Sequence, residues 1–303
     1  MTTSPVVVLA GGTGGAKLAR GMADVVGDEL VVVANTGDDI EIHGAYVSPD
    51  PDLCTFWLAD RIDARGWGLD GDTFATMDGL RELGIDVWFN LGDRDLAFCL
   101  RRAELLRGGA RLTDALAELT TALGVAARVL PMSDDSVRTE VQTGGAWVDL
   151  QRFLIQHRDA PVEDVRLEGI NEAAPTPEVL DAISRARAIV VGPSNPVISI
   201  GPILALPGMR EALRAAPAPV VAVSPIVGGH VLKGPTASFL EHAGHPVDAT
   251  GIAAVYGDLL DGLVCDEPWA GELPALRCDT MLSSPDARRY VAEATLRFAT
   301  ELS

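Results

Sequence analysis

The amino-acid sequence predicts an α/β protein whose mostly parallel sheet is covered by helices on both faces. Short runs rich in Val, Ile and Leu recur along the 303 residues, and helical stretches follow them. Runs that are apolar on both faces are typical of parallel strands buried between two helical layers. The six clearest runs, each predicted as a strand, are Val6–Ala10, Leu30–Ala34, Val87–Leu91, Ala127–Leu130, Ala188–Val191 and Val220–Val223.

The chain is expected to form one domain over residues 1–303, because no flexible linker, repeat or low-complexity tract divides it. A largely helical subregion is expected around residues 50–123, interrupted by the third of the predicted strands. A hairpin is expected around residues 137–150, where apolar and polar residues alternate and Gly144-Gly145 supplies the turn.

Composition excludes several classes of partner. The formal net charge of −19 argues against nucleic acid and anionic lipid, and no apolar run reaches the roughly 20 residues that span a membrane. No basic leader precedes the first strand pattern, so we expect a cytoplasmic protein. The four cysteines are far apart in sequence, which predicts free thiols rather than a zinc site or disulfides.

The first predicted strand is followed by a glycine turn and then a helix. This arrangement brings backbone N–H groups and the positive end of the helix to one point, which predicts an anion site. The loop is not a Walker A sequence, because Leu18 stands where that loop needs a hydroxyl, and the dinucleotide fingerprint is broken at Lys17. A tight turn without a ligand remains the alternative. The expected phosphate-binding residues are Gly11, Gly12, Thr13, Gly14, Gly15 and Lys17.

Several carboxylates follow the second predicted strand. Carboxylates beside a phosphate site suit Mg²⁺, which takes oxygen ligands and bridges to substrate phosphates. We expect Asp38, Asp50 and Asp52 to be functional. Asp39 and Glu41 are expected to be solvated loop acids.

Two further polar clusters carry candidate site residues. Arg94 lies between Asp93 and Asp95, which predicts a phosphate clamp, with a structural salt-bridge network as the alternative. Ser194 and Asn195 offer hydrogen bonds at a proline-stiffened turn after the fifth predicted strand. Ligands gather beyond the carboxyl ends of parallel strands, so the polar clusters that follow the six predicted strands are expected to line one cleft. These clusters are Gly11–Gly15, Asn35–Asp39, Gly92–Asp95, Ser133–Asp135, Gly192–Asn195 and Ser224–Gly229.

Seven segments together resemble the 2-phospho-L-lactate transferase family of deazaflavin coenzyme F-420 biosynthesis. They are GGTGGAK, NTGDD, SPDPD, LGDRDLA, LPMSDD, GPSNPVISIGPIL and SPIVGG, and they run in the family's order to about Gly229. The resemblance implies a Rossmann-like core with an added helical cluster, in a homodimer. It implies transfer of 2-phospho-L-lactate or phosphoenolpyruvate from a diphospho-5'-guanosine adduct to the ribityl hydroxyl of the deazaflavin FO, with Mg²⁺ required and GMP released.

The resemblance also assigns residues by position. Gly11–Gly15 would hold the nucleotide diphosphate, and Asp38 with Asp50 would ligate Mg²⁺. Ser194 and Asn195 would contact the nucleotide or the acid.

The acceptor side is assigned in the same way. Asp52 and Arg94 would contact the deazaflavin or its attacking hydroxyl, and either Asp52 or Asp93 would take the proton. The family usually has Thr where this chain has Leu53, so one polar contact is in doubt.

Two other interpretations compete with the transferase. A non-enzymatic sugar-nucleotide-binding regulator of the gluconeogenesis-factor type would share the glycine turn and the core, but lacks the S-P-D-x-D segment. A nicotinamide-dependent oxidoreductase requires an intact glycine fingerprint and a single ribose-binding acid, and neither is seen.

Overall fold

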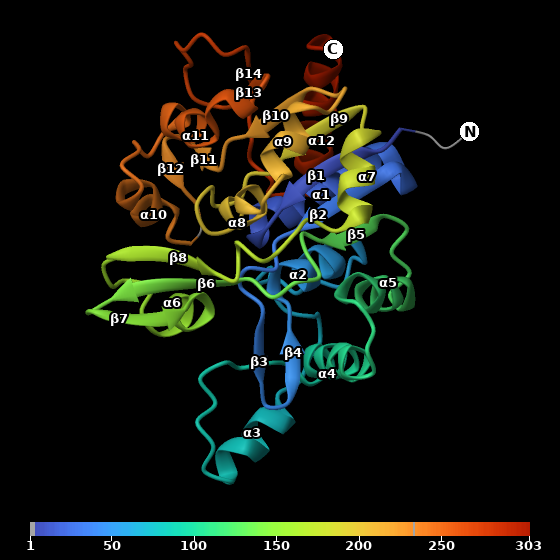
Figure 1. Cartoon of the computed structure of the whole chain (residues 1–303), viewed down its shortest axis with the longest axis vertical. Coiled ribbons are helices and arrows are strands. Elements are labelled where there is room, and N and C mark those ends of the chain that lie inside the picture. Colours follow the sequence, from blue (N-terminus) through green and yellow to red (C-terminus); the bar gives the residue numbers. More distant parts are fainter. Residues whose placement is uncertain (1–3, 233) are drawn as a thin grey trace.

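A seven-stranded sheet forms the centre of the computed structural model, which describes residues 4–232 and 234–303 (Figure 1). The strand order is β14-β13-β10-β9-β1-β2-β5, and every neighbouring pair is parallel. The predicted α/β class is therefore confirmed. The strands are β1 (Val6–Ala10), β2 (Leu30–Ala34), β5 (Arg128–Pro131), β9 (Ala188–Val191), β10 (Val220–Val223), β13 (Gly262–Cys265) and β14 (Ala275–Arg277).

The direction of the strand order reverses between β1 and β9. From β1 the chain builds outward through β2 to β5, and it then returns to β9 and builds outward the other way. This is the arrangement of a Rossmann-like sheet, in which ligands bind at the reversal point beyond the carboxyl ends of the strands. The fold therefore places a ligand site beside the loops that follow β1 and β9.

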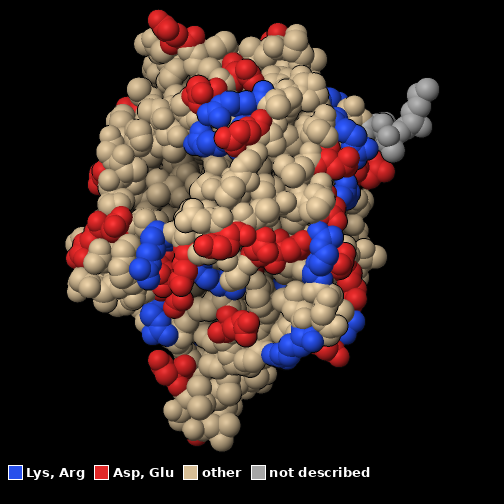
Figure 2. Space-filling model, viewed as in Figure 1, with Lys and Arg blue, Asp and Glu red and all other residues tan. Residues whose placement is uncertain are grey.

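A lobe inserted after β2 projects away from the sheet, at the lower end of the molecule in Figures 1 and 2. Its small core includes Met77, Leu91 and Cys99. The connecting helix α2 (Pro49–Leu58) and the later α5 (Leu112–Ala122) lie closer to the sheet. The lobe contains β3 (Ile40–Ile42), β4 (Ala45–Val47), α3 (Ala75–Glu82) and α4 (Asp93–Arg107).

The prediction of a strand at Val87–Leu91 is wrong. The segment belongs to no strand, although Val87, Phe89 and Leu91 do pack into the core of the lobe. The apolar residues that suggested a sheet strand instead fill a small local core. The adjacent Trp88 and Asn90 line the cavity described below.

A separate three-stranded antiparallel sheet flanks the core. It has the order β7-β6-β8, and β6 and β7 form a hairpin whose turn is Gly144-Gly145. Its elements, with the helix that follows β7, are β6 (Arg138–Thr143), β7 (Ala146–Asp149), α6 (Leu150–Gln156) and β8 (Asp164–Glu168).

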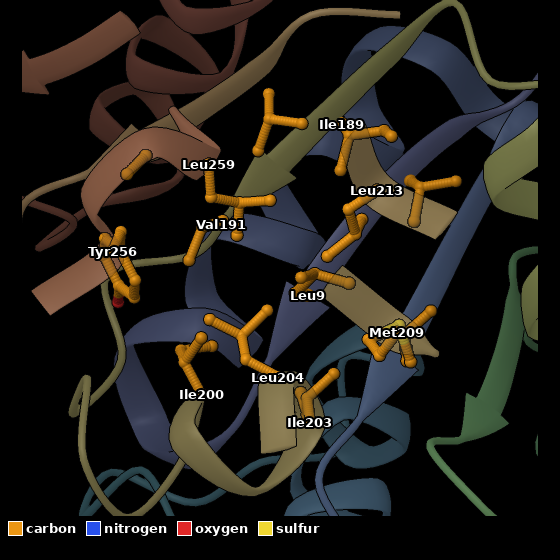
Figure 3. Packing of buried hydrophobic residues seen from close by; sticks show 14 of the residues in the cluster. Leu9, Ile189, Val191, Ile200, Ile203, Leu204, Met209, Leu213, Tyr256 and Leu259 are labelled. Atoms are coloured by element: carbon orange, nitrogen blue, oxygen red, sulfur yellow. The ribbon is translucent and has the colours of Figure 1, made fainter. Parts of the chain in front are cut away.

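Two hydrophobic clusters lie on opposite faces of the central sheet. Alternate residues of β1 serve one or the other: Leu9 faces the cluster drawn in Figure 3, whereas Val8 faces the second. The second cluster is covered by α2, α5, α1 (Gly12–Val26) and α12 (Pro285–Glu301). The first is covered by α7 (Pro177–Ser184), α8 (Gly201–Ala205), α9 (Met209–Arg214), α10 (Thr236–His242) and α11 (Ala249–Tyr256).

The remaining strands form the short antiparallel pair β11 (Ile226–Val227) and β12 (His230–Val231). The four cysteines are free, as expected. Within the described part of the chain, no helix has the length and apolar character needed to cross a membrane.

Candidate active site

A cavity of about 1030 Å³ opens at the reversal point of the sheet. The loops after β1, β2, β9 and β10 all contribute to its lining, which confirms the expectation of a shared cleft for those four clusters. The lobe supplies a further wall, and so do α6 and the segment that precedes α12. The polar cluster Ser133–Asp135, also expected there, is absent from the lining, and Asp134 accepts hydrogen bonds from Arg111 on the surface instead.

The glycine turn brings the start of α1 against the loop after β9. A Cβ atom on Gly14 would lie only 1.9 Å from the carbonyl oxygen of Pro193, and one on Gly15 would lie 2.5 Å from Ser194 Oγ. Close backbone approach therefore explains why these positions are glycine. Gly15 is buried in this contact and lies outside the lining. The predicted residues that do line the cavity here are Gly11, Gly12, Thr13, Gly14 and Lys17.

Asp38 and Asp50 form a buried acidic pair in the cavity wall. Both are less than 10% exposed, and the side-chain amide of Asn35 donates to both, at 3.4 Å to Asp38 and 2.9 Å to Asp50. Asp38 also accepts from Gln151 at 2.7 Å, and Asp50 accepts from the backbone N–H of Gly12. The two acids that the sequence predicted as metal ligands are therefore brought together.

Burial governs the protonation of this pair. It raises the pKa of Asp50 to about 6, against the opposing hydrogen bonds from Asn35 and Gly12. Burial, and then the charge of Asp50, raise the pKa of Asp38 well above its usual value. Two carboxylates that are costly to ionise side by side fit a divalent cation, because its charge and its preference for oxygen ligands would offset that cost.

Asp52 lines the cavity, but its carboxylate is already paired. The guanidinium of Arg102, itself fully buried in α4, donates to both carboxylate oxygens of Asp52. Arg102 also donates to the backbone carbonyl of Tyr46 at 2.9 Å, which ties α4 to β4. A carboxylate held by a buried guanidinium serves as a structural anchor, and this geometry does not support Asp52 as the proton acceptor.

Asp93 and Arg94 lie outside the cavity lining. The carboxylate of Asp93 accepts from the hydroxyl of Thr73 and from the N–H groups of Ala75 and Thr76, at the start of α3. These hydrogen bonds lower the pKa of Asp93. Arg94 is exposed and donates to the carbonyl of Asp70 at 3.4 Å. The structure therefore does not bring these two predicted residues into the cavity lining.

Ser194 and Asn195 are placed as predicted. Ser194 Oγ accepts from the N–H of Gly11 at 3.2 Å and so joins the two loops at the reversal point. Asn195 Oδ1 accepts from the N–H of Val197 at 2.9 Å, while its buried Nδ2 has no hydrogen-bond partner among the described residues. An amide donor left over in a ligand cavity is suited to a substrate oxygen.

The structure also tests what was expected of the other polar residues after β2. Asp39 was expected to be solvated but is 2% exposed and accepts from Ser48 at 2.7 Å, so that expectation is wrong. Glu41 is exposed, as expected. Asn35 is not acidic, so it was given no role of its own, although it directly precedes the acidic run after β2.

The lobe gives the cavity an aromatic wall that the sequence interpretation also missed. Its aromatic side chains lie between residues 67 and 89, in a stretch interpreted as helix and strand. The guanidinium of Arg152 stacks over the ring of Trp88 at 4.5 Å. The wall contains Trp67, Phe74, Trp88 and Phe89, and two further cations, Arg65 and Arg158, line the cavity.

A second group of possible metal ligands lies where α2 meets α4 of the lobe. Ligand atoms of Asp52, Asp95 and Cys99 fall within 4.8 Å of one another. Arg102 already compensates Asp52, and burial raises the pKa of the Cys99 thiol well above its usual value, which keeps it protonated. This group therefore suits a hard cation such as Mg²⁺ less well than the pair Asp38 and Asp50.

Comparisons with known proteins agree on one family. The family model described as "2-phospho-L-lactate transferase CofD" matches residues 6–275. A 2-phospho-L-lactate transferase from Methanosarcina mazei is 40% identical over 303 residues, covering 96% of this chain and 99% of that protein. A phosphoenolpyruvate transferase from Kitasatospora aureofaciens is 42% identical, covering 86% of this chain and 84% of that protein.

A solved structure shares the fold at low sequence similarity. It is the crystal structure of a UPF0052 family member from Bacillus halodurans, with a TM-score of 0.64 and 19% identity. The alignment covers 98% of this chain and 99% of that one. At this identity the likeness extends to the fold alone.

Proposed function

Because the chain belongs to the 2-phospho-L-lactate transferase family, we propose that it transfers a phosphate bearing a three-carbon acid from a diphospho-5'-guanosine adduct to FO. The acceptor atom is a ribityl hydroxyl of this deazaflavin. The products are coenzyme F-420-0, or its dehydro form, and GMP. The names of the relatives support both 2-phospho-L-lactate and phosphoenolpyruvate as the acid.

The observation that carries this proposal is the division of one cavity into two chemically different walls. The wall at the reversal point offers the N-terminus of α1, Lys17 and a buried acidic pair, which suits a diphosphate with its cation. The lobe wall offers Trp67, Trp88 and other aromatic side chains, which suit a flat ring system. A phosphorylated donor and a tricyclic acceptor need these two surfaces together.

The transfer is a displacement at phosphorus. A bond forms between the ribityl oxygen and the phosphorus that bears the acid, and the bond from that phosphorus to the bridging oxygen of GMP breaks. The electron pair of that bond leaves with GMP, and the proton of the hydroxyl goes to a base. The protein's contribution is to position the two substrates and to stabilise charge on the phosphate oxygens.

Named residues can perform these tasks. The N–H groups at the start of α1, with Lys17, would hold the diphosphate oxygens. Asn195 Nδ2 is available as a donor to a donor-substrate oxygen. Asp38 and Asp50 would hold Mg²⁺, which when bound supplies neutralising charge to the diphosphate.

The sugar-nucleotide-binding alternative is not favoured. The family model and the curated relatives are named as transferases, and the acidic segment that contains Asp50 lines the cavity. A homodimer is also proposed, on the family resemblance, and the cytoplasmic location stays a prediction. Light scattering of the purified protein would test the dimer, and a monomer mass would contradict it.

Product analysis tests the function. Purified protein is incubated with FO, Mg²⁺ and each of the two guanosine diphosphate adducts, and the product is identified by mass. We expect the mass of FO plus the acid-bearing phosphate, together with GMP. Asp50→Asn should lose this activity, whereas Asp28→Asn, an exposed acid away from the cavity lining, should keep it. Failure of the wild-type protein with both adducts would contradict the proposal.

A further inference from the structure

The acids around the cavity differ in how fully their oxygens are engaged. Five carboxylates line it in the described part of the chain: Asp38, Asp50, Asp52, Asp72 and Asp95. Four of them accept hydrogen bonds from N–H donors: Asp38 and Asp50 as described above, Asp52 from Arg102, and Asp72 from the N–H groups of Arg94 and Asp95.

Asp95 is the exception. Within the described residues, the hydrogen bond to its carboxylate comes from the Cys99 thiol, at 3.7 Å, and a thiol is a weak donor. The side chain is partly buried in the first turn of α4 and lines the cavity beside Asp52. The hydrogen bond between the N–H of Asp95 and Asp72 fixes the backbone at this position. A rigidly placed carboxylate with unengaged oxygens is what proton abstraction from a hydroxyl requires.

We propose that Asp95 is the general base that takes the proton of the acceptor hydroxyl. The inference rests on the proposed function and replaces Asp52 and Asp93 in this role, since both are engaged structurally. The O–H bond breaks as the oxygen attacks phosphorus, and the proton passes to a carboxylate oxygen of Asp95. The protonated acid then returns the proton to solvent after product release.

The surroundings of Asp95 raise its proton affinity, as a general base requires. Burial, and then the charge of Asp52, raise the pKa of Asp95 to about 7. Asp72 acts in the same direction, whereas Cys99 and Arg102 oppose it. A base whose pKa is near the working pH is ionised in a large fraction of the molecules and still binds a proton well. Because only the ionised carboxylate accepts a proton, the rate should rise as pH increases through about 7.

Kinetics of Asp95→Asn test the proposal. The amide keeps the size of the side chain but cannot act as this base. We expect kcat to fall by about 100-fold or more. The affinity for FO, measured by fluorescence, and the melting temperature should stay near those of the wild type. The limb of the pH profile near 7 should disappear. Asp86→Asn, an exposed acid on the same lobe, is the matched control and should keep both the rate and the limb.

A second measurement does not depend on turnover. The aspartate carboxyls of the wild type and of Asp95→Asn are titrated by carbon-13 NMR. The resonance that is present in the wild type and missing from the variant belongs to Asp95, and we expect it to titrate with an apparent pKa near 7. A value near 4 would overturn the proposal, as would equal rates and pH profiles for the two proteins. Absence of product from the wild type would instead overturn the proposed function itself.

Discussion

At the scale of single residues, the buried acids of the cavity are organised by neutral amides. Asn35 is the link, since its Nδ2 donates to Asp38 and Asp50 while its Oδ1 accepts from the N–H of Gly37 at 2.8 Å. That backbone contact fixes the orientation of the amide. The amide therefore holds the two carboxylates in place for the Mg²⁺ that we propose they bind.

Removal of this link should weaken cation binding. In Asn35→Ala the two carboxylates lose their common donor, so we expect Mg²⁺ or Mn²⁺ affinity to fall by about 10- to 100-fold, as for other partners that orient metal ligands. Isothermal titration calorimetry measures this directly. Asn171→Ala, at an exposed position, should bind the cation as the wild type does. Unchanged affinity in Asn35→Ala, with a normal melting temperature, would contradict the role of the amide.

The pair of Arg102 and Asp52 has a different purpose. Arg102 is fully buried, and it joins α4 of the lobe both to α2 and to β4. Arg102→Met would leave Asp52 buried without its partner, which typically costs about 3–5 kcal/mol of unfolding free energy. Urea denaturation followed by circular dichroism would measure the loss.

The neighbouring arginine is a natural control. Arg101 is exposed and pairs with Glu104 and Glu118 at the surface, so Arg101→Met should leave the urea midpoint nearly unchanged. The double variant Arg102→Met/Asp52→Leu should recover much of the stability, because no unpaired charge stays buried. Equal midpoints for the two single arginine variants would show that the buried pair contributes nothing.

At the scale of elements, the start of α1 is set by how closely it approaches the loop after β9. Gly14 is the tightest point, because a Cβ atom there would lie only 1.9 Å from the carbonyl oxygen of Pro193. Gly14→Ala should therefore displace α1 or that loop, at a cost of about 1–3 kcal/mol. Thermal denaturation would report the loss, and binding of the guanosine diphosphate adduct should weaken in parallel.

Substitution of a helical glycine that has no close neighbour is the control for the effect of helix propensity. A Cβ atom on Gly79 in α3 would meet no neighbouring heavy atom within 4 Å, and the φ of this residue is not positive. Gly79→Ala should leave the stability unchanged or raise it by up to about 1 kcal/mol. A destabilisation equal to that of Gly14→Ala would contradict the packing explanation.

The sequence predicted the elements that local pattern determines. Four of the six predicted strands lie in the central sheet with the predicted bounds, and a fifth is shifted by one residue to Arg128–Pro131. Val87–Leu91 failed because apolar residues filling a local core look the same as those of a sheet strand. The strands β13 and β14 were missed. Gly262 and Cys265 at the ends of β13 leave only two strongly apolar residues, and β14 has three residues and lies at the sheet edge.

The site was predictable at positions where the residue type suggests a binding role and where the residue follows the carboxyl end of a predicted strand. Asp38, Asp50, Ser194 and most of the glycine turn meet these conditions, and they meet in one cavity. The contacts of Asp52 depend on Arg102, which is 50 residues away in sequence, and no local pattern reveals that pairing. Packing also gives Asp95 and Asp93 different surroundings, because Asp95 lines the cavity whereas Asp93 accepts a hydrogen bond from Thr76. Their spacing in sequence does not reveal this difference.

At the scale of the whole molecule, the cavity lining combines a few cations with carboxylates in a protein that is acidic overall. Asp and Glu side chains form a band across the middle of the face in Figure 2, in a chain with a net charge of −19. Lys17, Arg65 and Arg158 nevertheless line the cavity. Local cations, rather than overall charge, therefore have to attract the donor substrate.

Under the proposed function, the cavity is large enough to hold both substrates at the same time. At about 1030 Å³ it reaches the upper end of the range for small-molecule sites, and its polar and aromatic walls suit different ligands at the same time. Initial rates measured over a grid of FO and adduct concentrations should give intersecting double-reciprocal lines. Parallel lines, together with release of GMP in the absence of FO, would show that the acid-bearing phosphate is first transferred to the protein.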